Sequence, residues 1–349
     1  MSNSASTHGS PARSVGVREV AVRAGVSRQT VSRVLNDHPE VAAGTKARVL
    51  QSLDELGYRM NNAARALGTR HSRTIGILAS DALEYGPSRS IAAIESSARA
   101  AGYWVSAAFA EASDAEAVVE AVDHLIAQGV EGIVAVAPHA GTLHTVDALR
   151  VGVPVLTLHS AGHGVHGFSV DQVAGARLAA AALADAGHRH IAHLAGPSDW
   201  LEAESRAEGW AAELAQRGLE PALAVEGDWT ARSGNDAAAA ILASGATGVF
   251  SANDQMALGL LGGLYEAGVS VPADISVVGF DDIPDAAYYW PPLTTVRQDF
   301  DELARRAVAT LTGGTSEEPA GDAPVLPTLV RRSSIAPPPQ HPARRRPSS

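Results

Sequence analysis

The sequence predicts an α/β protein with an all-helical unit at its N-terminus, followed by two doubly wound lobes built on parallel sheets. Three observations carry this prediction. Two short amphipathic stretches meet at a glycine within residues 17–36. From residue 73 onward, apolar runs typical of buried strands alternate with Ala-rich stretches typical of helices. About ten strand candidates exceed one comfortable sheet, which indicates two lobes with a cleft between them.

The N-terminal unit opens with a helix predicted by apolar spacing. Val17, Val20, Ala21 and Ala24 fall at i, i+3, i+4 and i+7, so they share one helix face, and the alanines let a second helix cross closely. Gly25 follows directly and supplies a permissive turn residue. A short helix that ends at such a turn is the first half of a helix-turn-helix motif.

A second helix follows, and its outer side carries the chemistry. Ser27 can cap this helix. Its apolar side comprises Val31, Val34 and Leu35, and its outer side comprises Arg28, Gln29, Ser32, Arg33 and Asn36. Arginine donates two hydrogen bonds to the major-groove edge of guanine, and glutamine pairs with adenine. This face predicts the reading of double-stranded DNA, and the alternative is a solvated amphipathic hairpin.

A third helix completes the unit. Val49, Leu50, Leu53 and Leu56 form its apolar side, and Gly57 ends it. The predicted DNA-binding domain spans residues 15–60, which is the size of known helix-turn-helix heads.

Charge is distributed unevenly along the 349 residues, whose net charge is −11. Residues 11–73 hold eleven Arg and Lys against five Asp and Glu, a net charge of +6. Residues 74–349 hold sixteen against thirty-three, a net charge of −17. A cationic N-terminal unit beside an anionic remainder is typical of a protein that grips nucleic acid through one part only.

The segment between the two parts, residues 61–72, is predicted to be a hinge helix. It is too short to be stable alone in water, so we expect it to fold on DNA. Leu67 is its sole large apolar side chain, flanked by Arg65 and Arg70. An apolar wedge between basic residues suits insertion into a minor groove. The alternative is a flexible linker.

The larger part is a predicted two-lobed core over residues 73–336. Its strand candidates are residues 74–80, 103–110, 132–138, 153–159, 190–196, 223–229, 248–254, 275–282 and 293–299, and helical stretches separate them. The N-lobe takes residues 73–170 and 299–327, and the C-lobe takes residues 171–298 and 328–336. In such sheets ligands bind beyond the carboxyl ends of the strands, so we expect a ligand site in the cleft.

Several classes of protein are disfavoured by the composition. The chain has no Cys and therefore no thiol chemistry. It shows neither a signal-peptide core nor an apolar run of membrane-spanning length, so a cytoplasmic protein without membrane contact is expected. No phosphate-loop, zinc-protease or nucleophile-elbow motif occurs, so we expect neither an enzyme nor a cofactor. The tails, residues 1–14 and 337–349, are predicted to be disordered.

Two groups of histidines are candidate metal ligands. One comprises His188, His190 and His193, and the other comprises His159, His163 and His166. Within the first group, His188 and His190 would share one strand face and His193 would point to the other. No Cys or paired carboxylate completes either group, so the prediction is polar turn residues and no metal site.

Taken together, these features of the sequence resemble the LacI/GalR family of sugar-responsive transcriptional repressors. The resemblance runs from about Val17 to Ala336. Its most specific blocks are VAVRAGVSRQTVSRVLN, LAGP, EGDWTARSG, ANDQMALG, DISVVGFDD and PPLTTVRQDF. Six blocks in the same order as in the family are not expected by chance. The resemblance implies two lobes of the periplasmic-binding-protein type and operator DNA and a sugar as partners.

The resemblance also assigns residues. It implies that Arg28, Gln29 and Arg33 read bases and that Leu67 opens the centre of the operator. Its implied effector contacts are Pro87, Ser88, His159, Glu202, Arg206, Trp229, Asn253, Asp281 and Gln298, with Phe300 at the pocket floor. The residue types agree with this, since an aromatic plane and hydrogen-bonding groups suit a pyranose. From the residues alone, Asp281 and Asp282 would be a solvated turn.

Departures from the family pattern concern the ligand and the assembly. His159 stands at an acidic position, Glu202 replaces a small hydroxyl residue, and Glu84 stands at an apolar position. A β-galactoside or related disaccharide is the expected effector, and a non-galactoside ligand is the alternative. No leucine heptad follows residue 336, so a homodimer on palindromic operator DNA is expected. A two-lobed sugar-binding transport protein is the main alternative, and it would explain the pocket but not the basic head.

Overall fold

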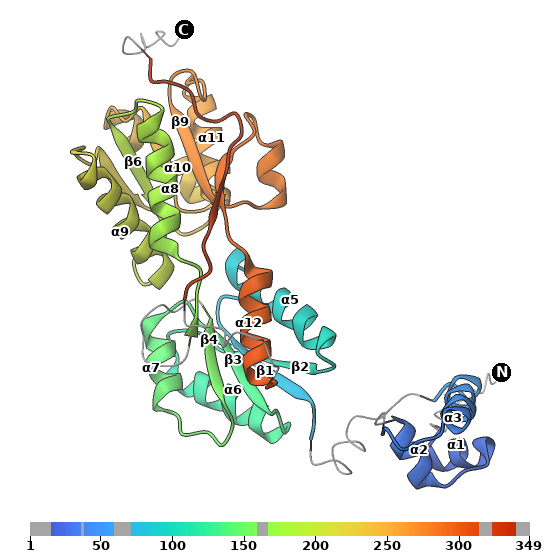
Figure 1. Ribbon diagram of the computed structural model, residues 1–349. Helices are drawn as coiled ribbons and strands as arrows, with labels where there is room; N and C mark the ends of the chain where they lie inside the picture. Colours follow the sequence, from blue (N-terminus) through green and yellow to red (C-terminus); the bar gives the residue numbers. More distant parts are fainter. Residues whose placement is uncertain (1–14, 36–37, 59–70, 159–166, 314–322, 340–349) are drawn as a thin grey trace, which may run out of the picture. The chain divides into compact units, whose positions relative to one another are not determined.

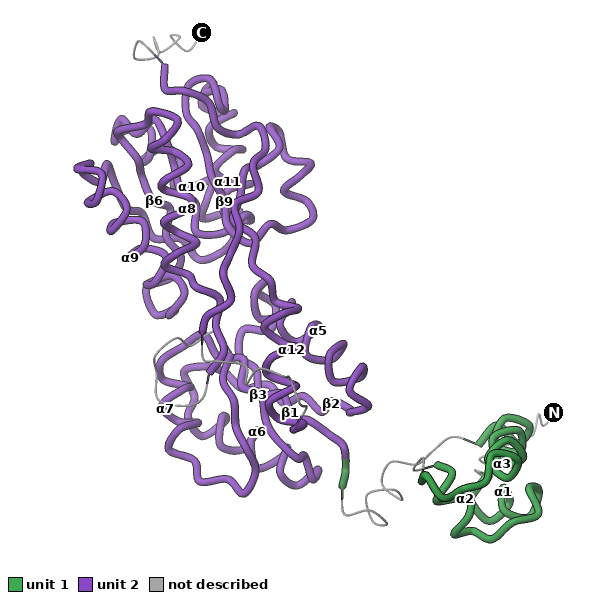
Figure 2. Tube along the Cα trace, viewed as in Figure 1, with its two compact units in different colours: residues 1–72 green, residues 73–349 purple. Residues whose placement is uncertain are grey.

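The computed structural model describes residues 15–35, 38–58, 71–158, 167–313 and 323–339 (Figure 1). Contacts divide the chain into residues 1–72 and residues 73–349 (Figure 2). Asn36, Leu67 and His159, and most of the predicted hinge helix, lie outside the described residues.

The first unit contains three helices over its described residues: α1 (Val17–Ala24), α2 (Arg28–Leu35) and α3 (Ala43–Glu55). Val20, Val31 and Val49 contribute one residue each to the centre of its core, and all three are fully buried. Burial of these side chains is what holds such short helices together, because each is too short to be stable alone.

The turn between α1 and α2 has the predicted chemistry. Gly25 has a φ of 67°, and the Ser27 hydroxyl accepts a hydrogen bond from the backbone N–H of Thr30 at 3.0 Å. Gly57 also has a positive φ and follows the end of α3. The prediction for Leu50 was wrong, since this side chain is 49% exposed. Leu50 follows Val49 by one residue, so a helix carries it away from the core.

The N-lobe sheet of the second unit has five parallel strands in the order β2-β1-β3-β4-β5. These are β1 (Thr74–Ala79), β2 (Trp104–Phe109), β3 (Gly132–Val136), β4 (Val155–Leu158) and β5 (Gly167–Phe168). Helices α5 (Tyr85–Ala100) and α12 (Phe300–Leu311) cover one face, and α6 (Ala115–Ala127) and α7 (Ala140–Ala148) cover the other. Alternate residues of β1 and β3 enter the two cores, which explains why these strands are apolar throughout.

The C-lobe sheet has six strands in the order β11-β10-β9-β8-β6-β7. These are β6 (Ile191–Ala195), β7 (Leu223–Glu226), β8 (Gly248–Ser251), β9 (Ser276–Asp281), β10 (Thr294–Arg297) and β11 (Thr328–Val330). One face carries α8 (Gln172–Asp185) and α9 (Leu201–Gln216), and the other carries α10 (Ala231–Ala243) and α11 (Asp254–Glu266). Only β11 runs antiparallel to its neighbour among these strands.

Three stretches of chain run between the sheets (Figure 1). The first joins β5 to α8, the second joins β10 to α12, and the third precedes β11. The first and third lie side by side, since Val170 and Val325 form a parallel bridge. A cluster of three crossings lets two lobes reorient about one region of the chain.

Several local expectations need correction. The sequence did not predict the short strands β5 and β11 or the 3-10 helix η1 (Pro284–Tyr288). Among the residues described, no helix combines the length and the apolar character needed to cross a membrane. Residues 337–339, placed in the tail by the sequence, are described, and Pro338 lies near Gly187.

The histidines before β6 do not share a strand face as expected, because β6 begins only at Ile191. His188 is buried, with its Nδ1 at 3.0 Å from the Thr247 hydroxyl and its Nε2 at 2.9 Å from the Ala336 carbonyl, whereas His190 is exposed. His193 is buried and stacks on Phe250. Each buried ring is therefore a core residue, and burial lowers the pKa of His193 to about 4.

Candidate functional site

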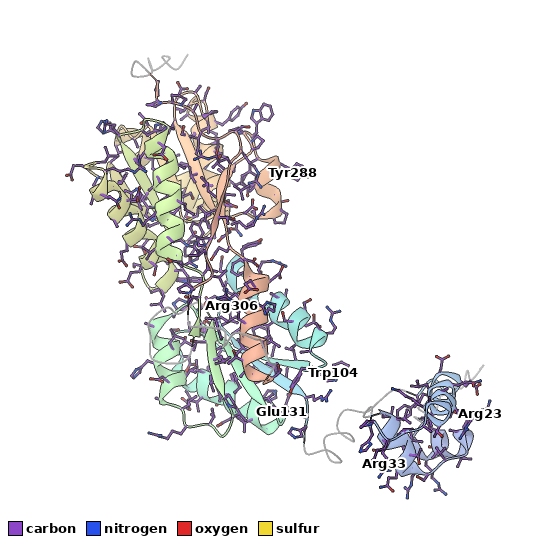
Figure 3. All side chains as sticks on the ribbon, viewed as in Figure 1. Arg23, Arg33, Trp104, Glu131, Tyr288 and Arg306 are labelled. Carbon is purple, nitrogen blue, oxygen red and sulfur yellow. The ribbon has the colours of Figure 1, made fainter. Side chains whose placement is uncertain are left out.

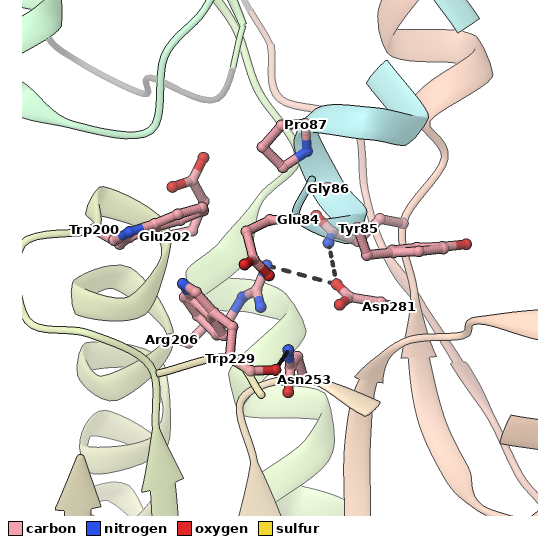
Figure 4. Close-up of a pocket in the computed structure, with 11 residues that line it drawn as sticks. Glu84, Tyr85, Gly86, Pro87, Trp200, Glu202, Arg206, Trp229, Asn253 and Asp281 are labelled. Carbon is pink, nitrogen blue, oxygen red and sulfur yellow. Dashed lines mark hydrogen bonds and ion pairs between the residues drawn. The ribbon is translucent and has the colours of Figure 1, made fainter. Parts of the chain in front are cut away.

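A cavity lies between the two lobes of the second unit, at the carboxyl ends of the strands (Figure 4). The N-lobe contributes the start of α5, and the C-lobe contributes loops and the start of α9. The lining residues are Glu84, Tyr85, Gly86, Pro87, Trp200, Glu202, Arg206, Trp229, Asn253, Asp281 and Gln298. We call it the interlobe cavity.

The buried guanidinium of Arg206 is the centre of the site. Its Nε donates to Gln172 Oε1 at 2.9 Å, and its Nη1 donates to the Ala252 carbonyl at 2.5 Å. Its Nη2 lies 3.8 Å from a carboxylate oxygen of Asp281. The guanidinium also lies over the ring of Phe280, 4.0 Å from its centroid. These contacts fix the cation in one orientation, as a rigid planar group requires when it is buried.

Two glutamines, Gln172 and Gln298, connect Arg206 to Asp281 by a second route. Gln172 donates to Gln298 at 2.8 Å, and Gln298 donates to Asp281 at 2.7 Å. Because Asp281 also contacts Arg206, the four side chains of Arg206, Gln172, Gln298 and Asp281 form a closed ring of polar contacts. Asp281 has a φ of 106°, a backbone conformation that is costly for a residue with a side chain. Burial raises the pKa of Asp281 to about 6.

Aromatic rings form one wall of the cavity. Trp200 and Trp229 meet edge to face, with ring centroids 5.3 Å apart and planes at 66°. A Cβ on Gly196 would lie 2.1 Å from the Trp229 ring, so only glycine leaves room for this indole. Two indoles that meet at an angle give a ligand two aromatic surfaces, which is the arrangement that the C–H faces of sugar rings favour.

The side chain of Asn253 stabilises the backbone of Trp229. Its Nδ2 donates to the Trp229 carbonyl at 3.0 Å, and its Oδ1 accepts from the N–H of Met256 as the cap of α11. Trp229 has a φ of 69°, and this hydrogen bond stabilises that backbone. The predicted effector contacts Asn253 and Trp229 are therefore joined by a hydrogen bond, so a change in one is expected to displace the other.

Two glutamates line the cavity, and the pKa of each is raised. Burial raises the pKa of Glu202 to about 8, an effect that the nearby Arg206 opposes. Burial, reinforced by Asp81 and Asp228, raises the pKa of Glu84. At neutral pH the Glu202 carboxyl therefore carries a proton and is able to donate a hydrogen bond.

A raised pKa in the folded protein gives a stability contribution that is lost as pH rises, because the unfolded chain releases this proton near pH 4.5. We expect the Glu202→Gln protein to lose less stability than the wild type between pH 6.5 and 8. The difference should reach about 1–2 kcal/mol, from roughly 1.4 kcal/mol per pH unit for one proton. Urea unfolding at each pH measures it, and parallel curves for the two proteins would contradict it.

The cavity brings together most of the effector residues predicted from the sequence. Pro87, Glu202, Arg206, Trp229, Asn253, Asp281 and Gln298 line it. Ser88 does not line it: Pro87 and Ser88 lie in the first turn of α5 and not in a loop, and the Ser88 hydroxyl donates to the Tyr85 carbonyl at 3.1 Å. Phe300 does not line it either, because it packs behind the Tyr85 ring in the N-lobe core.

The sequence reasoning missed other residues of the site. Tyr85, Gly86 and Trp200 line the cavity and were not predicted. Trp200 follows the carboxyl end of β6, where ligands bind in sheets of this kind, so its position in the sequence was a signal that could have identified it. Asp254 was also missed. It does not line the cavity but follows the lining residue Asn253 and is fully buried, accepting from the Thr295 hydroxyl at 2.6 Å and from the Ile283 N–H at 2.9 Å.

Asp282 does not behave as the solvated turn residue expected from the sequence. Its side chain is 6% exposed, and it accepts hydrogen bonds from Arg297 and Arg332, each at 2.6 Å. The two arginines come from β10 and from the chain after β11, so Asp282 ties the last strands of the C-lobe to β9.

The second candidate surface is the outer face of α2 in the first unit. Arg28, Gln29, Ser32 and Arg33 are all exposed there, opposite the buried Val31 and Val34. Arg33 projects from the surface of this unit (Figure 3). Two guanidinium groups and an amide on one exposed helix face are the groups that read base edges in a major groove.

Comparisons with known proteins address both parts of the chain. Residues 17–61 match the model for bacterial regulatory proteins of the lacI family, and residues 180–335 match that for a periplasmic binding protein-like domain. The lactose operon repressor of Escherichia coli is 37% identical over 93% of this chain and 91% of its own length. Regulator MalR of Streptomyces coelicolor is 33% identical over 91% of this chain and 96% of its own length.

Solved structures agree with this result. A Lac repressor dimer bound to operator and an anti-inducer has a TM-score of 0.81 and 37% identity, over 93% of this chain and all of that one. The transcriptional regulator CelR in complex with cellobiose has a TM-score of 0.64 and 28% identity, over 92% of this chain and 99% of that one. With a helix-turn-helix unit and a two-lobed core matched in the same order, the chain belongs to the LacI family of DNA-binding transcriptional regulators.

Proposed function

We propose that this protein is a repressor that binds palindromic operator DNA as a homodimer and that a sugar in the interlobe cavity controls its affinity for the operator. One observation carries the proposal: a basic helix-turn-helix unit and an interlobe cavity with two indoles and a buried Arg206 occur in one chain. A transport protein would need only the second of these parts. The solved Lac repressor dimer bound to operator supports the same combination.

Large exposed side chains support the homodimer. Trp104 and Phe109 are each 61% exposed on β2, which is an edge strand of the N-lobe sheet. Tyr288 and Trp290 are 87% and 92% exposed in the C-lobe. Figure 3 shows Trp104 and Tyr288 at the surface. Exposed aromatic residues of this size, on an edge strand and at the end of η1, are typical of surfaces that a partner covers.

The residues of the cavity support a sugar effector. Trp200 and Trp229 offer stacking surfaces, and Glu84 and Glu202 offer oxygens to hydroxyl groups. The proposed effector is a β-galactoside or related disaccharide. Since Glu84 and Glu202 depart from the family pattern, glucosides belong in the same panel of test sugars.

Control by the sugar follows from the position of the cavity. The N-lobe supplies Glu84 through Pro87, and the C-lobe supplies the remaining lining residues. A ligand that contacts both lobes favours the lobe orientation in which both sets of contacts form. If the DNA-binding units of the dimer fit the operator in only one orientation, sugar and operator binding are coupled reciprocally.

Fluorescence anisotropy with labelled palindromic duplexes tests the proposal, first alone and then with each sugar of the panel. Two protein chains per duplex and a shift in affinity with at least one sugar are expected. The proposal fails if the protein ignores duplex DNA at moderate salt, or if no sugar shifts its affinity.

Base reading by α2 has its own test. We expect Arg33→Ala to weaken binding to the cognate operator by roughly 5- to 150-fold, the equivalent of about 1–3 kcal/mol for a bidentate base contact. Binding to random duplex should change far less. Arg48→Ala is the matched control, since it removes an exposed arginine from α3 of the same unit. Equal losses on cognate and random duplex for Arg33→Ala would contradict base reading.

A further inference from the structure

A second cavity between the lobes adjoins the first at Trp200. Asp81 and Glu111 line it from the N-lobe, and Asp199 and Glu204 line it from the C-lobe. Of the described residues, Trp200 alone lines both this cavity and the interlobe cavity. Neither the family resemblance nor the comparisons assign a role to this second cavity.

Contacts from both sides fix Trp200 in place. The His139 ring meets the Trp200 ring at an angle of 69°, with centroids 5.1 Å apart, and the Trp229 ring meets it with centroids 5.3 Å apart. His139 is held in turn, with its Nε2 at 3.0 Å from Asp81 and its Nδ1 at 3.1 Å from the Asp199 carbonyl. Since His139 and Asp81 belong to the N-lobe and Trp229 belongs to the C-lobe, Trp200 is an indole of the C-lobe that contacts aromatic rings of both lobes.

The backbone strengthens this junction. The Leu201 N–H donates to the Pro138 carbonyl at 3.0 Å, and His139 pairs with Trp200 in an antiparallel bridge. The second cavity is therefore built on a point where the lobes are already joined. A ligand there would contact both lobes, as one in the interlobe cavity would.

The groups that line the second cavity select a class of ligand. An indole wall, the hydroxyls of Ser113 and Ser198, and several carboxylates suit a ring that carries hydroxyl groups. The excess of carboxylates disfavours a ring that carries a phosphate or an acid group. Among the described residues, no group of three His, Cys, Asp or Glu is arranged to hold a metal ion.

We infer that the second cavity is a subsite for the second ring of an effector with at least two sugar rings, with Trp200 as the wall that the two subsites share. The inference rests on the proposed function, because it places one ring of the sugar in the interlobe cavity. On this inference, residues outside the interlobe cavity make the protein selective for a disaccharide over a monosaccharide.

Gly141 offers a direct test. It lines the second cavity near the start of α7, and a Cβ added there would meet no atom within 4 Å. Gly141→Leu therefore places a branched side chain at the cavity without displacing backbone, and Gly141→Ala is the matched control at the same position. Ser113→Leu obstructs the cavity from a different segment and serves if Gly141→Leu fails to fold.

Isothermal titration of the full chain with galactose against lactose, and with glucose against cellobiose, measures the gain from the second ring. For at least one pair the wild type should bind the disaccharide about tenfold or more tightly than the monosaccharide. Gly141→Leu should reduce this ratio to near one and leave monosaccharide binding unchanged, whereas Gly141→Ala should keep the ratio.

Two results would overturn the inference while leaving the proposed function in place. One is equal affinity for monosaccharide and disaccharide in every pair, with the monosaccharide still shifting operator affinity. The other is an unchanged ratio in both Gly141→Leu and Ser113→Leu. If none of the four sugars binds or shifts operator affinity, the inference and the sugar part of the proposed function fall together.

Discussion

Replacing Arg206 with methionine is expected to lower the free energy of unfolding by about 3–5 kcal/mol and to abolish any response to sugar. Methionine keeps much of the side-chain volume but removes the cation. Asp281 would then be buried without its ion pair, and Gln172 and the Ala252 carbonyl would each lose a donor. The cost of leaving a buried charge unpaired exceeds the net value of the pair itself.

Arg217→Met is the matched control for Arg206→Met. Arg217 is the C-cap of α9, the helix that contains Arg206, and it pairs with the acidic groups of Asp185 and Glu213, but its side chain is 32% exposed. Ion pairs that water screens contribute about 0–1 kcal/mol. Urea unfolding of both variants and sugar titration by anisotropy give the comparison. Similar losses of stability in the two variants would show that the burial of Arg206 does not set its role.

A single methyl group on Gly259 is expected to be the most damaging small change in the C-lobe. A Cβ at this position would lie 1.6 Å from the Ala231 carbonyl oxygen of α10, and one on Gly234 would lie 2.0 Å from the Met256 carbonyl oxygen of α11. The two helices therefore touch backbone to backbone. Gly259→Ala forces them apart and should lower the free energy of unfolding by about 1–3 kcal/mol or more.

Gly262→Ala provides the control within the same helix. A Cβ there would lie 3.6 Å from its nearest neighbour, the side-chain amide of Asn235, which is ordinary contact. Alanine favours a helix over glycine by roughly 0.5–1 kcal/mol, so Gly262→Ala should be neutral or stabilising. Thermal melting of the two variants separates packing from helix propensity. Equal melting temperatures would show that α10 and α11 do not cross as closely as described.

These glycines also show where sequence reasoning stops. Gly259, Gly262 and Gly263 all lie in α11. A Cβ on Gly259 or Gly263 would lie 1.6 or 2.7 Å from an atom of α10, whereas one on Gly262 would lie 3.6 Å from its nearest neighbour. Their spacing along the chain gives their position on the helix, but the packing partner comes from α10.

The cavity shows the same limit. Trp229 was predicted on a family block, whereas Trp200 was missed, and only the order of the strands brings the two indoles together. Phe300 fits the family pattern at the level of sequence, but its ring turns to the N-lobe core behind Tyr85. A side chain that starts near a pocket contacts a ligand only if its neighbours leave that direction open.

The sequence by itself determined the helix-turn-helix and most strands and helices of the core, because these depend on the spacing of apolar residues and on turn residues such as Gly25. The tertiary structure alone decided that Trp200 borders two cavities, that His139 of one lobe fixes it, and that Glu202 holds its proton at neutral pH. The spacing of apolar residues determines structure through contacts between residues that are near neighbours in the chain. Burial and charge act between residues that only the folded sheets bring within a few ångströms.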